Sequence, residues 1–282
     1  MTGTRASGAG ALLRLARVAI VGVLVIDPRA AAGQLRPIDP IGWDVLDPAH
    51  SWIADVGVGV MQNQLASLAG TRGDLLELGN FRVAWRSGRI GVEIAGTLVR
   101  RFRDGSVFAD PVLGANPPDG QIRQDAGDVR AATLIRLNGA SPVQVALRFG
   151  TRLPTTSEEV GLDRDRTDFF ATLGARYRMG LLSVGGESGV AINGTRVDGV
   201  DQLDVWTYSL GVDYRFGPVT SSGAIVGHND MHRRVIRGNE DLNELRLGVR
   251  AGDRVRFAAT FVQGLADFSP DRGLLVSIGL RN

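Results

Sequence analysis

Apolar and polar side chains alternate with a period of two along most of the chain after residue 50. The clearest stretch is 204–216, where Trp206, Tyr208, Leu210, Val212, Tyr214 and Phe216 share one face and mostly polar residues share the other. Because successive side chains of a strand point to opposite faces, such a stretch predicts a strand that is apolar on one side only. About a dozen segments of roughly eight to twelve residues show this pattern, so we expect an all-β fold.

The connections between these segments alternate in length. Short turns are predicted at 87–88, 138–141, 179–180, 217–218 and 252–253, and longer polar connections near 61–74, 102–127, 153–167, 194–203, 229–243 and 264–272. Glycine, asparagine and proline supply the backbone conformations that tight hairpins need. Short turns at one end and long loops at the other are typical of a transmembrane barrel.

Aromatic residues on the apolar face fall into two groups by height. One group lies near the short turns and the other near the long loops: Trp52, Trp85, Tyr177, Tyr214 and Phe216, then Phe102, Phe149, Phe169, Trp206 and Phe261. A soluble sandwich would also alternate, but it has no reason to sort aromatics by height, whereas a membrane barrel carries one girdle at each interface. Residues 51–282 therefore predict a transmembrane antiparallel up-and-down β-barrel of about 12 strands, closed because lipid cannot satisfy an open sheet edge.

The first 33 residues have the order of an export signal. Arg5, Arg14 and Arg17 precede the apolar run 18–26, and small residues follow at 30–33. The run is too short to cross a bilayer as a helix, so we expect a signal peptide over 1–33 and localisation in the outer membrane. The partners expected on this basis are outer-membrane lipid and the outer-membrane assembly machinery.

Residues 34–50 carry Pro37, Pro40 and Pro48 and do not alternate. This segment is interpreted either as a periplasmic N-terminal segment or as a plug folded into the lumen. The pattern of residues does not choose between the two.

All 32 basic residues are arginine, and the chain has no cysteine, which excludes disulfides. Without residues 1–33 the formal charge is −1, from 28 arginines and 29 carboxylates. Since the cations are interleaved with carboxylates, we expect no nucleic-acid partner. The oligomeric state is left open.

One stretch resembles a known family. Residues 149–162, FGTRLPTTSEEVGL, followed by DRDRTDFF at 163–170, are similar to a motif in Gram-negative outer-membrane barrels of the family labelled MetA-pathway of phenol degradation, with Thr156 where glycine is usual. The resemblance covers about 45 residues around 149–192 and implies a barrel fold more than any substrate. The chain also ends in Asn282 where such barrels commonly end in an aromatic residue.

The polar face is rich in charged residues, which a barrel would turn towards its lumen. The expected lumen-lining residues are Asp55, Arg82, Glu93, Asp128, Arg130, Arg136, Arg148, Arg176, Glu187, Asp213, Arg215, Glu244, Arg246 and Arg256, with Arg250 beside them. Arginine forks both pair with carboxylates and hold anionic solutes. These side chains therefore predict either a packed ion-pair network or a narrow aqueous path that selects by charge.

Two groups of residues are candidate metal sites. Glu158, Glu159, Asp163, Asp165 and Asp168 offer oxygen ligands, but their spacing is not that of an EF-hand and Arg164 and Arg166 compete for them. His228 and His232, with Asp230 between, are interpreted as polar residues of an external loop. We expect no metal and no cofactor.

Catalytic motifs are lacking from the sequence. His50 adjoins Ser51, but adjacent strand residues point to opposite faces, and neither an H-x-S-N-G nor a G-x-S-x-G string occurs. Three functions remain: a narrow channel or uptake pore for small solutes, which we favour, an outer-membrane hydrolase of the lipase type, and a non-transporting structural or adhesive barrel.

Overall fold

The computed structural model describes residues 35–66, 68–107, 120–139, 141–163, 165–194, 202–231 and 241–282. The predicted signal peptide lies outside the described residues. The elements are β1 (Trp52–Ala66), β2 (Thr71–Ser87), β3 (Ile90–Val107), β4 (Ile122–Asp125), β5 (Val129–Arg136), β6 (Val143–Leu153), the 3-10 helix η1 (Glu158–Val160), β7 (Asp168–Met179), β8 (Leu182–Gly194), β9 (Gln202–Phe216), β10 (Val219–Asp230), β11 (Leu242–Ala251), β12 (Val255–Gly264) and β13 (Arg272–Arg281).

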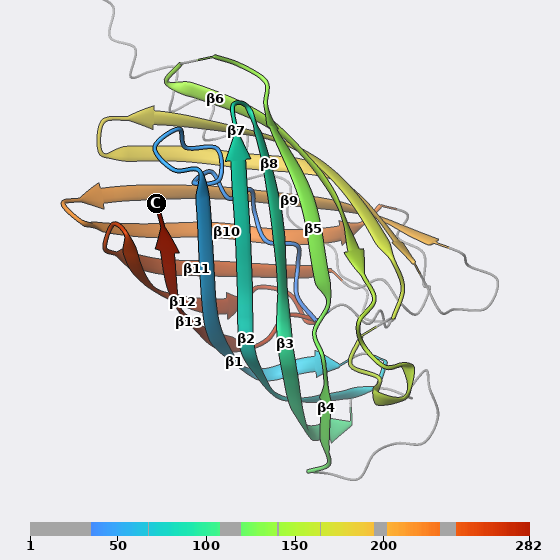
Figure 1. Ribbon diagram of the computed structural model, residues 1–282. Coiled ribbons are helices and arrows are strands. Elements are labelled where there is room, and N and C mark those ends of the chain that lie inside the picture. Colours follow the sequence, from blue (N-terminus) through green and yellow to red (C-terminus); the bar gives the residue numbers. More distant parts are fainter. Residues whose placement is uncertain are drawn as a thin grey trace, which may run out of the picture.

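Antiparallel pairing between consecutive strands closes the sheet into a barrel (Figure 1). The ring closes where β1 pairs with β13, from Ile53 opposite Arg281 to Gln62 opposite Arg272. Both β4 and β5 pair with β3, at different heights, so together they fill one place in the ring. The predicted all-β barrel of about 12 antiparallel strands is confirmed.

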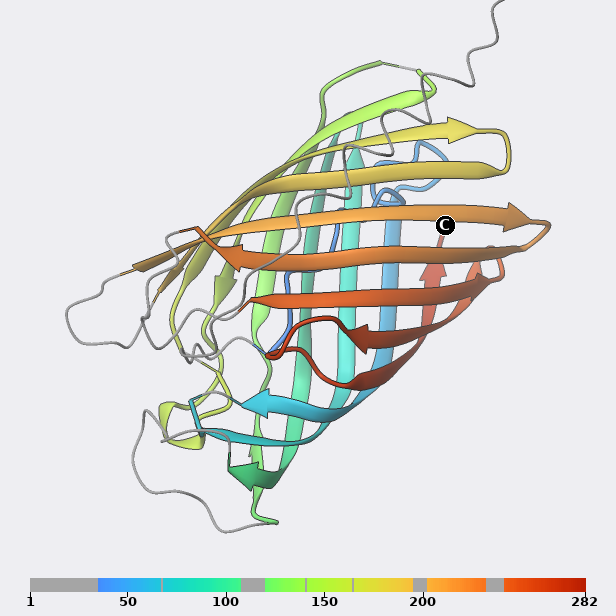
Figure 2. The ribbon, with the colours of Figure 1, turned by 180° about the vertical axis from the view of Figure 1, so that it is seen from behind.

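Connections of different length lie at the two ends of the barrel. Figure 2 shows the short hairpin turns at the end that also holds the C-terminus, and the longer connections at the other. Two of the predicted long connections are wrong in extent, because β1 continues to Ala66, β2 begins at Thr71 and β3 continues to Val107. The polar residues at these positions lie on strands that extend beyond the apolar belt.

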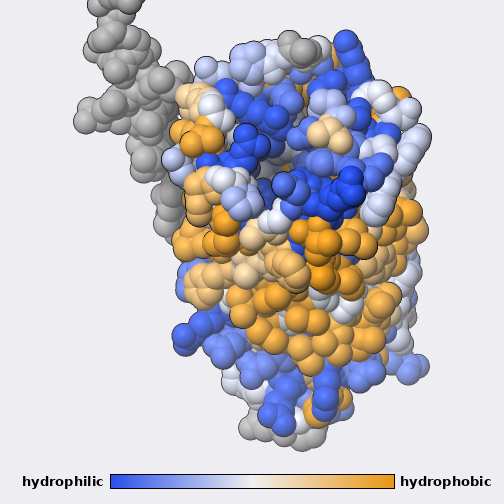
Figure 3. All heavy atoms as spheres, turned by 60° about the vertical axis from the view of Figure 1, so that its left-hand side comes forward, coloured by the Kyte–Doolittle hydropathy of each residue, from blue (hydrophilic) through white to orange (hydrophobic). Residues whose placement is uncertain are grey.

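The outer face of the barrel is apolar around its middle. Figure 3 shows an apolar belt between two hydrophilic zones. Large side chains such as Leu98, Phe169, Leu210 and Phe257 are more than half exposed on it. Exposing so much hydrocarbon costs free energy in water but not in lipid, so this surface is suited to a bilayer.

A glycine shifts the alternation in β2 and β3. Gly79 has φ +67°, a left-handed conformation that glycine adopts without strain, and the pairing of β1 with β2 slips beside it. Below this bulge Arg82 faces inward, and above it the inward positions are those of Glu77 and Leu75. The neighbouring β3 shifts in the same way, so Phe102 is fully buried in the interior. Its predicted place in the outer aromatic girdle is therefore wrong.

The last residue joins the two ends of the ring. Asn282 accepts backbone hydrogen bonds from Ser51 (3.0 Å) and Trp52 (3.1 Å) at Oδ1 and donates through Nδ2 to the Ser51 hydroxyl (2.6 Å). His50 Nδ1 also contacts the Asn282 carbonyl oxygen. Among the described residues, no helix has the length and apolar character needed to cross a membrane.

Candidate functional site

The interior of the barrel contains the chain's own N-terminal segment, residues 35–50. Leu35 packs with Phe102, Ala69 and Leu162 near the long connections, whereas the carbonyls of Pro48 and His50 accept hydrogen bonds from Arg86 beside a short turn. The segment thus runs along the length of the lumen and is drawn inside the barrel in Figure 1.

Apolar side chains seat the segment against the barrel wall. Ile38, Ile41, Val45 and Leu46 are buried in one cluster with inward residues of several strands. The wall provides hollows at glycines: a Cβ on Gly174 would lie 2.7 Å from Ile41 Cδ1, and one on Gly91 would lie 2.6 Å from Val45 Cγ1. Side chains larger than hydrogen would clash with the segment at these two positions.

Carboxylates of the segment pair with arginines of the wall. Asp39 accepts from Arg130 on β5 (2.6 Å) and from Arg246 on β11 (2.8 Å). Asp44 accepts from Arg82 on β2 (2.8 Å) and Arg256 on β12 (2.9 Å). Each aspartate therefore ties the segment to two distant parts of the ring.

Both aspartates are held in their charged form. Partial burial disfavours the charge of Asp39, whose side chain is 51% exposed, but Arg130 and Arg246 outweigh it and keep the pKa of Asp39 well below its usual range. In the same way burial is outweighed at Asp44 by Arg82 and Arg256, so that the pKa of Asp44 is also well below its usual range. Their ion pairs consequently persist through mildly acidic pH.

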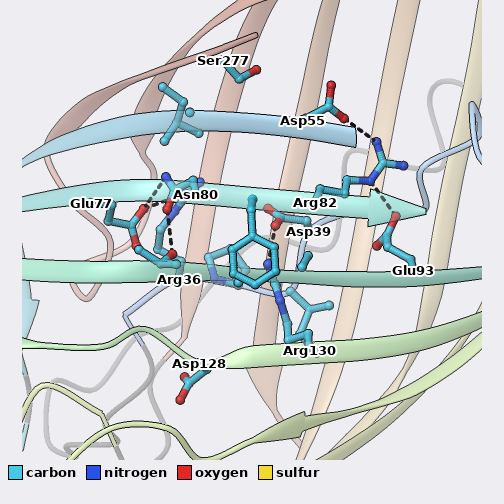
Figure 4. Close-up of a pocket in the computed structure, with 18 of the residues that line it drawn as sticks. Arg36, Asp39, Asp55, Glu77, Asn80, Arg82, Glu93, Asp128, Arg130 and Ser277 are labelled. Carbon is cyan, nitrogen blue, oxygen red and sulfur yellow. Dashed lines mark hydrogen bonds and ion pairs between the residues drawn. The ribbon is translucent and has the colours of Figure 1, made fainter. Parts of the chain in front are cut away.

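An arginine holds the start of the N-terminal segment, near the long connections. Arg36 lies 3.6 Å from carboxylate oxygens of both Glu77 on β2 and Glu244 on β11. Figure 4 shows Arg36, Asp39 and Glu77 around one of the interior cavities, with Asp55, Arg82 and Glu93 further along. In addition, the Ile41 amide donates to Glu187 Oε2 (3.1 Å), and Arg148 donates to the Asp39 carbonyl (2.6 Å).

The structure brings most of the predicted lumen residues into ion pairs. The pairs that involve them are Arg82 with Glu93 and Asp55, Arg256 with Asp55, Arg148 with Glu187, Arg176 and Arg250 with Asp213, Arg246 with Glu244, and Arg152 with Asp128. Among the described residues, Arg136 and Arg215 make no such pair, and Arg215 is exposed near the short turns.

The densest network of ion pairs lies towards the long connections. It includes residues that the alternation of apolar and polar positions does not predict to line the lumen. Arg152 contacts Asp128 (2.9 Å), Asp163 (3.2 Å) and Asp168 (2.5 Å), and Arg100 contacts Asp163 (3.0 Å) and Glu77 (3.2 Å). All six side chains are buried. Arg152 continues the inward alternation of Arg148 and could have been found, whereas Arg100 and Glu77 lie beyond the bulge at Gly79.

Two of the acidic candidate metal ligands have arginine partners in the structure. Asp163 and Asp168 pair with arginines, and His228 is buried on β10, so its predicted place in an external loop is wrong. His232 lies outside the described residues. Within the described ranges, no group of three His, Asp or Glu side chains is placed to hold a metal. His50 and Ser51 both bond to Asn282.

Two cavities lie beside the N-terminal segment. One of about 280 Å³ is lined by Arg36, Asp39, Glu77, Arg100 and Arg152 among others. The second, of about 560 Å³, opens towards the short turns between the segment and the wall of β8, β9 and β10. That wall carries small inward residues, Ser183, Gly185, Ser209, Gly211 and Ser222, and these leave the space unfilled.

Comparison with solved structures places the fold among outer-membrane barrels. The COG4313 outer membrane channel from Pseudomonas putida F1 matches with a TM-score of 0.58 at 13% identity, covering 92% of this chain and all (100%) of that chain. A porin refined at 1.8 Å resolution matches at 0.38 and 12% identity over 82% of this chain and 99% of its own. Outer membrane phospholipase A from Escherichia coli matches at 0.40 and 10% identity over 88% and 98%.

The first of these likenesses shows a shared barrel fold, and the other two score too low to carry an argument. No protein-family model matches the chain, and neither does any curated protein sequence. The family suggested by residues 149–170 therefore stays a prediction.

Proposed function

We propose that the chain is an outer-membrane channel for small solutes, with a charged interior that residues 35–50 keep narrow. The observation that carries the proposal is the combination of an apolar belt outside with charged, partly hollow space inside. A barrel built only for support has no need of cavities lined by arginine and carboxylate, since a packed apolar interior avoids the desolvation of charges.

The N-terminal segment is the element that would control the passage. Its contacts with the wall include ion pairs of Asp39 and Asp44 and a cluster of apolar side chains. Arg36 and several hydrogen bonds of the segment's backbone add to them. Because the strands pair with one another and not with this segment, loosening it leaves the hydrogen bonds of the ring intact. The narrow interior then becomes wider without unfolding of the barrel.

Conductance in planar bilayers tests the proposal. The chain without its signal should give small, discrete current steps. Asp39→Asn combined with Asp44→Asn should give larger or more frequent steps, because the segment then loses its four ion pairs with Arg82, Arg130, Arg246 and Arg256. Asp47→Asn is the matched control, since the carboxylate of Asp47 lies 3.7 Å from Arg178 and otherwise accepts from the neighbouring Ala49 amide (3.1 Å), which an asparagine oxygen can also do. Silence of all three proteins in correctly folded form would reject a channel and favour a structural barrel.

A hydrolase has no comparable support. The His50 ring and the Ser51 hydroxyl each bond to Asn282, and the described residues show no hydrogen bond between these two side chains. Among the described residues the interior charges are committed mainly to arginine and carboxylate pairs, which provide no nucleophile next to a base.

A further inference from the structure

The larger cavity has an unequal distribution of charge. Among the described residues that line it near the short turns, the guanidinium groups of Arg176, Arg178, Arg215 and Arg250 face only two carboxylates, those of Asp47 and Asp213. The remaining charged residues of the lining already have a partner: Asp39, Asp44, Arg82 and Arg256 in the pairs described above, Glu187 with Arg148, and Asp253 with Arg281.

The arginines in excess are incompletely used. Arg176 contacts Asp213 Oδ2 at 3.2 Å, and Arg250 approaches Oδ1 of the same carboxylate only to 3.7 Å. Arg178 lies 3.7 Å from Asp47, and no ion pair is recorded for Arg215 within the described ranges. Each guanidinium offers five donors, so this group keeps many donors for a ligand. The side chains of Arg178 and Arg250 are 39% and 42% exposed to the cavity and its mouth.

The space beside these arginines is large enough for an organic molecule. Its volume of about 560 Å³ lies within the range of small-molecule sites, roughly 300–1,000 Å³. Many of the residues that line it on β8, β9 and β10 are glycine and serine, and these leave room for a ligand on that side. Ile41 and Trp43 of the N-terminal segment form the opposite, partly apolar side.

We propose that this cavity is a binding site for a small organic anion, held through a carboxylate or phosphate group by Arg176, Arg178 and Arg250. Planar guanidinium forks bind both groups in a bidentate manner, and Asp213 occupies only part of their capacity. In the channel proposed above, the site would favour anionic solutes at the end that carries the short turns. To that extent the inference rests on the proposed function, but binding itself needs no conductance.

Equilibrium dialysis with radiolabelled succinate measures the site directly on the full mature chain in detergent. Binding should saturate at one site, and inorganic phosphate as competitor shows whether a phosphate group is taken as well as a carboxylate. Potassium chloride at matched ionic strength is the control for simple screening. Equal displacement by chloride and by phosphate would overturn a built site.

Two variants and a matched control locate the binding. Arg176→Gln with Arg250→Gln should raise the dissociation constant for succinate at least tenfold, whereas Arg254→Gln, an exposed arginine of the β11–β12 turn outside the cavity lining, should change it less than twofold. Ser222→Phe fills the cavity without altering charge and should also abolish binding. If neither the double variant nor Ser222→Phe weakens succinate binding, the assignment of binding to this cavity is wrong.

The proposed binding site and the proposed channel can be rejected independently of each other. Saturable succinate binding by a barrel that does not conduct would support the site and reject the channel. A conducting barrel that binds no succinate or phosphate would do the reverse.

Discussion

The two ends of the barrel interior use the same residue types in different ways. Near the long connections Arg100 and Arg152 are buried and contact Glu77, Asp128, Asp163 and Asp168 at close range. Near the short turns Arg178 and Arg250 are about two fifths exposed, and their nearest carboxylates are 3.7 Å away. Arginine at the first end has lost its water and depends on its partners, whereas at the second end it keeps water that a ligand can replace.

The difference arises from what surrounds the charges. The network is covered by Leu35 and Phe102, and by the connection that carries η1. At the other end the glycine and serine wall leaves space beside the arginines. The number of charged residues alone therefore does not distinguish a structural network from a binding site. The size of the side chains next to the charges makes the distinction.

The largest expected effect is the loss of a buried arginine. Arg152→Met would leave Asp128, Asp163 and Asp168 without their shared partner, and breaking such buried pairs costs about 3–5 kcal/mol. Arg250→Met, at the exposed end, should cost about 1 kcal/mol or less. Urea unfolding of the reconstituted barrels, followed by the heat-dependent gel mobility of folded barrels, measures both. Equal losses would remove the distinction between the two ends.

An arginine on the outer face should be nearly as damaging as the loss of the buried one. Leu210 is 57% exposed in the middle of β9 on the apolar belt, where Leu210→Arg should cost about 2–4 kcal/mol of folding into lipid. Leu173→Ile, also on the belt, is the conservative control. Refolding yield in lipid vesicles is the measurement, and normal yield of Leu210→Arg would show that this face does not contact hydrocarbon.

The bulge at Gly79 can be tested by adding one methyl group. Gly79→Ala should cost about 1–2 kcal/mol from its left-handed backbone, and more because the new Cβ would lie 2.8 Å from Leu98 Cδ1. Gly88→Ala shares the positive φ but meets nothing within 4 Å, so it isolates the backbone cost. A larger loss for Gly88→Ala than for Gly79→Ala in the same unfolding assay would contradict the packing described here.

The smallest expected effect is that of mild acid on the N-terminal segment. A carboxylate whose pKa is lowered in the folded state stabilises that state above its ordinary pKa, near 4, and loses the contribution only as pH falls through the lowered value. Because the pKa values of Asp39 and Asp44 are both lowered, conductance should be alike at pH 7 and pH 5. Wider openings at pH 5 would mean that other groups hold the segment.

Much of the barrel could be predicted from local sequence, because most strands show an alternation of apolar and polar residues within their own residues. The prediction fails where the alternation itself shifts: Gly79 moves Glu77 and Phe102 to the inner face, and no rule of period two anticipates this. The partners of Asp39 could not be predicted either, since Arg130 and Arg246 are 91 and 207 positions away and only closure of the ring brings them together.

The hydrogen bonds of Asn282 have a consequence for the order of assembly. Strands β1 and β13 are the most distant pair in the chain, and all other neighbours in the ring are joined by connections much shorter than the sequence between these two. The entropy of loop closure makes this seam the slowest to form. Ser51 directly follows residues 35–50, so the hydrogen bonds of Asn282 to Ser51 and Trp52 fix the end of this segment to the seam in the same step that completes the ring.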